Sequence, residues 1–182
     1  DGILTTNFSF TLEEQLHRGF SEINKNKLKY FRRTYGQKNC DNKYLLYTCF
    51  AFGEDEKQQD QRRVWHIHGH IRNEQSVLLS HYTYSGVLRK MLTENYDISK
   101  GQREITSTGQ FLVKSWLDLF LIADVYILGL SLSTDELDLW WLLERKKLGF
   151  DGSMIGSVTY YAPEPSTNGG TIVNACHNDV NV

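Results

Sequence analysis

Three short polar segments carry the residue types in this chain that could do chemistry. They are Thr5-Thr6-Asn7 near the start, His68-Gly69 in the middle and Gly129-Leu130-Ser131 further on. Each follows an apolar run of the kind that forms strands. In an open α/β sheet the carboxyl ends of the strands build the ligand crevice. The three segments therefore predict one site assembled from distant parts of the chain.

His68 is the candidate general base. Because side chains alternate along a strand, His66 and His68 point to the same face, opposite to Ile67. A neutral imidazole beside a crevice can take a proton from water or from a ribose hydroxyl. The glycine that follows, Gly69, lets the backbone turn sharply or approach a ligand closely. The alternative is a structural histidine that is hydrogen-bonded at the end of a strand.

A metal site is a second functional possibility for the same strand. His66 and His68 are spaced so that both could bind one metal ion. A third ligand would be needed, and His70, His81 or an acidic residue could supply it. Two histidines at this spacing are a weak indication, so we expect no metal.

Asn7 is the candidate for holding a sugar or a water molecule. Its amide offers two donors and an acceptor, so it can bind a hydroxyl and orient a water at once. The alternative is that Asn7 only caps the helix expected to begin near Thr11, or occupies a left-handed turn.

Gly129 and Ser131 lie between the most clearly apolar strand and a helix. Glycine permits close approach of a ligand, and the Ser131 hydroxyl can donate to a phosphate or a ribose. Asp135 and Glu136 would stabilise the first turn of that helix but repel a pyrophosphate. We therefore expect this strand end to meet a ribose. The alternative is a plain strand-to-helix turn with Ser133 as the N-cap.

Strands that alternate with helices must position these segments. Right-handed crossovers bring the carboxyl ends of parallel strands to one edge of a sheet. We predict an α/β fold: a Rossmann-like three-layer domain with a mostly parallel sheet. The chain starts without Met and almost inside a strand, so we expect a domain incomplete at its N-terminus and part of a longer protein. The expected strands are 2–6, 44–50, 63–68, 124–129 and 158–162, and the expected helices are 11–23, 82–96, 111–122 and 133–148.

Size, charge and cysteine content bound the class of protein. The 182 residues suffice for one core and show no repeat or linker, so we predict a single domain over residues 1–182. A formal net charge of −2 gives no basic field for nucleic acid. No apolar run is long enough to span a bilayer, so we expect no membrane partner. The three cysteines form no close pair, which favours a reducing, cytoplasmic location.

Taken in order, the three segments resemble the sirtuin-like NAD-cleaving domains of bacterial antiphage defence proteins. The resemblance covers residues 2 to about 162. It is carried by Thr5-Thr6-Asn7-Phe8 with the following Leu12-Glu13, by Ile67-His68-Gly69, and by the segment from Ile127 to Asp135. The order and separation of these motifs are similar to those of the family.

The resemblance implies an NAD glycohydrolase with NAD as its substrate. Such domains deplete cellular NAD when phage infection triggers them, and their partners are further copies or other domains of the same protein. It implies that Asn7 holds the ribose or the attacking water and that His68 is the general base. The implied NAD contacts are Thr5, Thr6, Ser9, Gly69, Gly129 and Ser131.

The chain departs from the family pattern at two places. Ser9 stands where the family usually has an acidic residue, two places after the asparagine. The Gly-rich phosphate loop is expected before Thr5, and no Gly-x-Gly-x-x-Gly occurs in the chain. We therefore expect these 182 residues alone to be inactive on NAD. The alternative function is a catalytically degenerate module that binds NAD or ADP-ribose, or a purely structural one.

Overall fold

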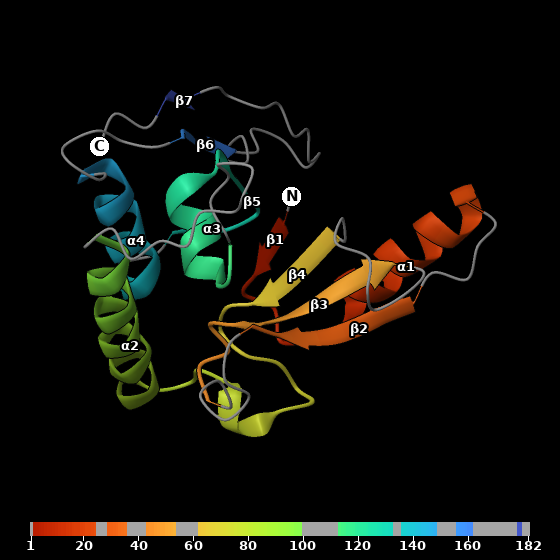
Figure 1. Ribbon diagram of the computed structural model, residues 1–182, viewed down its shortest axis with the longest axis horizontal. Coiled ribbons are helices and arrows are strands. Elements are labelled where there is room, and N and C mark those ends of the chain that lie inside the picture. The colour runs from red at the N-terminus through yellow and green to blue at the C-terminus, as the bar shows by residue number, and fades with distance from the viewer. Residues whose placement is uncertain are drawn as a thin grey trace, which may run out of the picture. The chain divides into compact units, whose positions relative to one another are not determined.

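The computed structural model describes residues 2–24, 29–35, 43–53, 62–99, 113–132, 136–148, 156–161 and 178–179 (Figure 1). The chain divides into two compact units. The first comprises residues 1–91 and 103–117, and the second comprises residues 92–102 and 118–182. Each unit has its own sheet.

The first unit contains a four-stranded sheet in the order β1-β4-β3-β2. β1 (Gly2–Thr5) runs parallel to β4 (Arg62–His66). β3 (Thr48–Gly53) is antiparallel both to β4 and to β2 (Lys29–Thr34), and Figure 1 shows β4, β3 and β2 as neighbouring arrows. The parallel pair thus lies at one side of the sheet and includes both strands that precede Asn7 and His68.

Helix α1 (Thr11–Asn24) follows β1 and has Glu13 and Glu14 in its first turn, where carboxylates favour the helix dipole. The Glu14 N–H donates to the carbonyl of Phe10 at 3.0 Å, which starts the helical hydrogen-bond pattern. Glu13 is fully buried, whereas Glu14 is exposed. One of the two carboxylates therefore belongs to the interior of the unit.

The core of the first unit is built on strands β3 and β4 and on the start of helix α2 (His81–Ser99). Tyr44 packs on this helix at Gly86, where a Cβ would lie 2.0 Å from the tyrosine hydroxyl. The preceding segment contains the short 3₁₀ helix Glu74–Ser76. Buried apolar side chains include Leu46, Cys49, Ala51, Val64, Trp65, Val87, Met91 and Trp116.

The second unit contains the strand order β5-β6-β7. β5 (Val125–Leu128) is parallel to β6 (Val158–Tyr161), and β7 (Asn178–Asp179) is antiparallel to β6. Helix α3 (Trp116–Ile122) precedes β5, and α4 (Leu137–Leu148) follows it in the chain. Within the described residues, no helix combines the length and apolar composition needed to cross a membrane.

The end of α3 is capped by a lysine from α4. The Lys146 ammonium donates to the carbonyls of Phe120, Leu121 and Ala123 at 3.0, 3.3 and 2.7 Å. These are carbonyls that the helix itself leaves without a partner, and a cation favours the negative end of the helix dipole. Burial lowers the pKa of Lys146 to about 8.

The expected α/β class is confirmed, but a mostly parallel, three-layer Rossmann-like sheet is not. Among the described strands, β1–β4 and β5–β6 are parallel, while β2–β3, β3–β4 and β6–β7 are antiparallel. Two described strands, β2 and β7, were not expected from the sequence, and β2 falls between the expected helix 11–23 and the expected strand 44–50. β2 is an edge strand, where positive side chains are common because they discourage pairing with another chain.

The expected helix over 111–122 begins later in the structure. Residues 111 and 112 lie outside the described part, and α3 starts at Trp116. The Trp116 N–H donates to the carbonyl of Leu46 at 3.1 Å, so the first turn of α3 is attached to the segment before β3. This tertiary hydrogen bond is invisible to the local apolar pattern that predicted a longer helix.

Candidate functional site

The structure brings Asn7 and His68 to the ends of two neighbouring parallel strands. In the β1–β4 pair, Thr5 lies opposite His66. The Ile67 N–H continues the pairing by donating to the carbonyl of Thr5 at 3.0 Å. Asn7 and His68 each lie two residues beyond this pair, so they lie at the carboxyl end of the same two-strand unit.

The segments after the two strands are also hydrogen-bonded to each other and to their surroundings. The Ile71 N–H donates to the carbonyl of Phe8 at 3.0 Å, which joins the loop after β4 to the loop after β1. The His68 carbonyl accepts from the Leu78 N–H at 3.0 Å. The two candidate catalytic residues therefore lie on loops whose backbones are held by hydrogen bonds.

Both backbone polar groups of Asn7 are engaged, while its side chain is exposed. The Asn7 N–H donates to the Thr5 hydroxyl oxygen at 3.1 Å. The Asn7 carbonyl accepts from Nδ1 of His66 at 2.7 Å. The backbone of Asn7 is thus held in place, while its side chain lies at the surface.

His66 joins the Asn7 loop to helix α1. Its Nε2 lies 2.6 Å from Oε1 of Glu13, and both side chains are fully buried. Since a carbonyl can only accept, Nδ1 must carry a proton toward Asn7. A single further proton then lies between Nε2 and the Glu13 carboxyl, as an imidazolium–carboxylate pair or as a neutral imidazole with a carboxylic acid.

Aromatic rings surround this buried pair. The rings of Phe10 and Phe50 have centroids 4.9 and 5.8 Å from that of His66. The His70 ring lies 5.4 Å from His66, and neither of its nitrogens has a hydrogen-bond partner in the described part of the chain. Burial, reinforced by positive charge at His66 and at neighbouring arginines, lowers the pKa of His70 to about 4.

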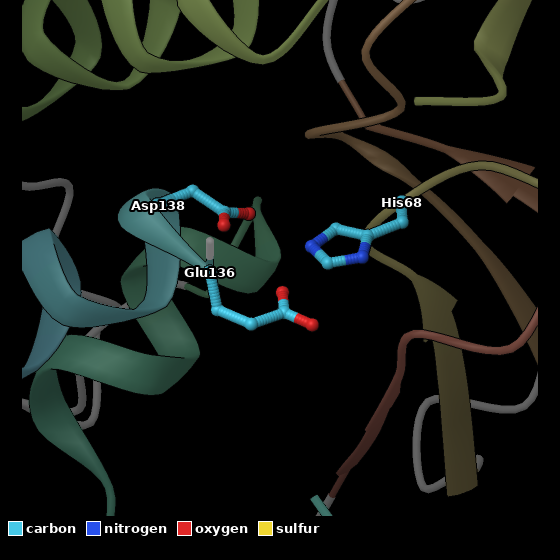
Figure 2. Close-up of side chains that lie close together, drawn as sticks. All are labelled: His68, Glu136 and Asp138. Atoms are coloured by element: carbon cyan, nitrogen blue, oxygen red, sulfur yellow. The ribbon is translucent and has the colours of Figure 1, made fainter. Parts of the chain in front are cut away.

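His68 is 3% exposed and packs against Tyr84, with ring centroids 5.5 Å apart in an edge-to-face arrangement. Figure 2 shows its imidazole extending from the segment that continues β4. The next residue, Gly69, has φ of +86°, and a Cβ there would lie 2.1 Å from the Ser76 carbonyl oxygen. Only glycine fits this turn, so Gly69 determines the path of the backbone just after His68.

The residues at the end of β1 that are predicted to contact NAD differ in their burial. Thr5 is buried and its hydroxyl accepts from Asn7, so it shapes the turn. Thr6 is half-buried, and Ser9 is exposed with its hydroxyl hydrogen-bonded to that of Thr11 at 3.2 Å. Thr6 and Ser9 are the members of this group with side chains at the surface.

Gly129 and Ser131 belong to the second unit and follow β5. Gly129 is exposed with φ of +65°, and a Cβ there would have no atom within 4 Å. The carbonyl of Leu130 accepts from the Tyr160 hydroxyl at 2.7 Å, which fixes the turn to β6. Glu136 and Asp138 extend from the start of α4 (Figure 2), whereas Ser133 and Asp135 lie outside the described residues.

Sequence reasoning gave no role to Glu13 and only a metal-binding alternative to His66. Their partnership spans 53 residues, so no local pattern reveals it. One signal was available: Glu13 lies three residues before Leu16 and so shares a face with the apolar stripe of the helix. A carboxylate in that stripe must find a buried partner.

Comparison with known proteins identifies the family. A family model described as the SIR2-like domain matches residues 1–142, which is most of the chain. No curated protein and no solved structure matches the chain. SIR2-like domains use NAD as a substrate, so the match supports an NAD-related activity. With Asn7 and His68 both inside the matched region, the chain belongs to the SIR2-like domain family.

Proposed function

We propose that this domain is an NAD glycohydrolase, which releases nicotinamide from NAD. The observation that carries the proposal is the parallel β1–β4 pair, whose neighbouring ends bear the Asn7 amide and the His68 imidazole. The SIR2-like family supports NAD as the substrate. The predicted NAD contacts remain Thr5, Thr6, Ser9, Gly69, Gly129 and Ser131.

In the proposed reaction, the bond between ribose C1′ and the nicotinamide nitrogen breaks. The bonding electrons leave with nicotinamide and neutralise the positive charge of its ring. A water oxygen bonds to C1′, and His68 accepts the proton that this water loses. Asn7 holds the ribose hydroxyl or the water in line with C1′. The products are nicotinamide, ADP-ribose and a proton.

The resemblance to defence proteins extends the proposal to biology. We propose that the full protein depletes NAD in the bacterial cytoplasm when phage infection triggers it. A fall of cellular NAD after infection, absent when His68→Ala replaces the wild type, is the expected result. Unchanged NAD in infected wild-type cells would contradict this role without bearing on the chemistry.

A first experiment measures nicotinamide release from NAD by the natural full-length protein. We expect His68→Ala to lower the rate by roughly 10²–10⁴-fold, the usual contribution of a general base. His81→Ala is the matched control, because His81 is an exposed histidine at the start of α2. Equal release by wild type and His68→Ala would reject the proposed mechanism.

A second candidate function is binding of NAD or ADP-ribose without turnover. Ser9 favours it, since this residue offers a hydroxyl bonded to Thr11 where the family usually has a carboxylate. Calorimetric titration with ADP-ribose separates the two functions. Tight binding together with no release of nicotinamide by the wild type would favour the binding module.

A further inference from the structure

We propose, resting on the proposed function, that the buried Glu13–His66 pair positions Asn7 for the reaction by holding its main-chain carbonyl. Nδ1 of His66 donates to that carbonyl at 2.7 Å, across 59 residues of sequence. Nε2 of the same ring is held by Glu13 at 2.6 Å. His66 and Glu13 are thus positioning residues, and Asn7 is the group that meets the substrate.

The His66 imidazole is hydrogen-bonded at both nitrogens, so the direction in which its Nδ1–H donates is fixed. Glu13 comes from helix α1, while His66 is the last residue of strand β4. The ring therefore connects a helix, a strand and the loop after β1. The bond that one ring nitrogen makes sets the proton on the other, so Glu13 also determines how His66 faces Asn7.

The rings around His66 remove the remaining freedom of its side chain. Phe10 and Phe50 pack on it, and they contact each other with centroids 4.8 Å apart. Phe10 is itself three residues beyond Asn7, and the Arg72 guanidinium lies over its ring, with Cζ 3.8 Å from the ring centroid. Swinging the imidazole away would require this cluster to open.

A buried acid and histidine are a costly way to fill a core. Replacing a buried ion pair by well-packed apolar residues often leaves the stability of a protein unchanged or increases it. Glu13 Oε2 has no hydrogen-bond partner among the described residues, so its pairing with His66 is its main compensation. The benefit that apolar residues could not provide is a fixed donor for the Asn7 carbonyl.

Loss of this donor should affect the rate more than the affinity for NAD. Many contacts hold a dinucleotide, but the Asn7 amide acts at the reacting ribose. A displacement of about 1 Å at a reacting group can cost on the order of 10²-fold in rate. The expected signature is a lower kcat at an almost unchanged KM.

The test uses two double variants of the full-length protein that differ in one donor. Glu13→Leu/His66→Asn removes the acid but keeps an amide near the position of Nδ1, from which it can donate to Asn7. Glu13→Leu/His66→Leu has nearly the same volume and no donor. Thermal unfolding of both variants, with kcat and KM for NAD, separates positioning from a structural role.

We expect the two double variants to unfold at similar temperatures. The variant with asparagine should keep kcat within about fivefold of wild type, and the variant with leucine should lose about 10–100-fold with KM changed less than about threefold. Equal kcat in the two double variants, with an active wild type, would overturn the positioning role alone. A wild type that releases no nicotinamide would overturn the proposed function as well.

Discussion

At the scale of single residues, the buried histidines His66 and His70 of the first unit differ in their hydrogen bonding. His66 uses both ring nitrogens, one for the Asn7 carbonyl and one for Glu13. His70 lies 5.4 Å away and, in the described part of the chain, uses neither. A carboxylate faces the first ring at hydrogen-bond distance. The second ring stays neutral because apolar rings and positive charges surround it.

This difference predicts how stability depends on pH. The pKa of His70 is about 4 in the folded protein against 6.5 in the unfolded chain. As the pH falls from 6.5 to 4, the unfolded chain therefore takes up a proton that the folded protein does not. We expect the free energy of unfolding to decrease by up to about 3 kcal/mol over this range.

Urea unfolding at several pH values between 4 and 7 measures this slope. His70→Leu is the control, since leucine does not titrate and fits an apolar cage. In the variant, the free energy of unfolding should depend less on pH, because the contribution of His70 is absent. The same pH dependence in wild type and variant would contradict a neutral, buried His70.

At the scale of elements, the turn after β4 shows how backbone geometry serves the site. Gly69 adopts φ of +86° directly after His68, and its Cα faces the Ser76 carbonyl. The N–H of Gly69 donates to the His66 carbonyl at 3.1 Å, which closes the turn. The direction of the His68 segment therefore depends on a residue without a side chain.

Gly69→Ala is expected to destabilise the protein by at least about 2 kcal/mol, from backbone strain together with a steric clash. Gly129→Ala is a matched control, because its φ is +65° but its Cβ would meet no atom within 4 Å. That control should cost only about 1 kcal/mol. Denaturant unfolding of both variants gives the comparison, and equal losses would contradict the tight turn.

At the scale of the whole molecule, the chain forms two compact units with mixed sheets. In each unit, the strands that lead into the predicted site segments have a parallel neighbour: β1 and β4, before Asn7 and His68, pair with each other, and β5, before Gly129, pairs with β6. The antiparallel strands beside them extend each sheet.

Ligand binding to the whole protein should be visible as added stability. A ligand that binds only the folded state at a hundred times its Kd adds about 2.7 kcal/mol. We expect saturating ADP-ribose to raise the Tm of wild type and of His68→Ala alike, because in the proposed reaction His68 acts on the attacking water and does not hold ADP-ribose. No increase at any concentration, in a wild type that releases nicotinamide, would show that the product does not stay bound.

The sequence by itself determined the family, the α/β class and the order of the polar segments that end the strands. Strand runs such as Arg62–His66 and the Gly69 turn are local, so periodicity and residue type reveal them. The last turn of α4 likewise contains Arg145, Lys146 and Lys147, a local pattern typical of the carboxyl end of a helix. These features depend on neighbours within a few residues.

Only the tertiary structure decided which of these residues support one another. Lys146 looks in the sequence like a surface cation, yet it caps α3 from 23–26 residues away. Glu13 looks like a first-turn carboxylate, yet it pairs with His66 across 53 residues. Burial removes water as a partner, so each buried charge must find a protein group, and chain folding alone brings that group into reach.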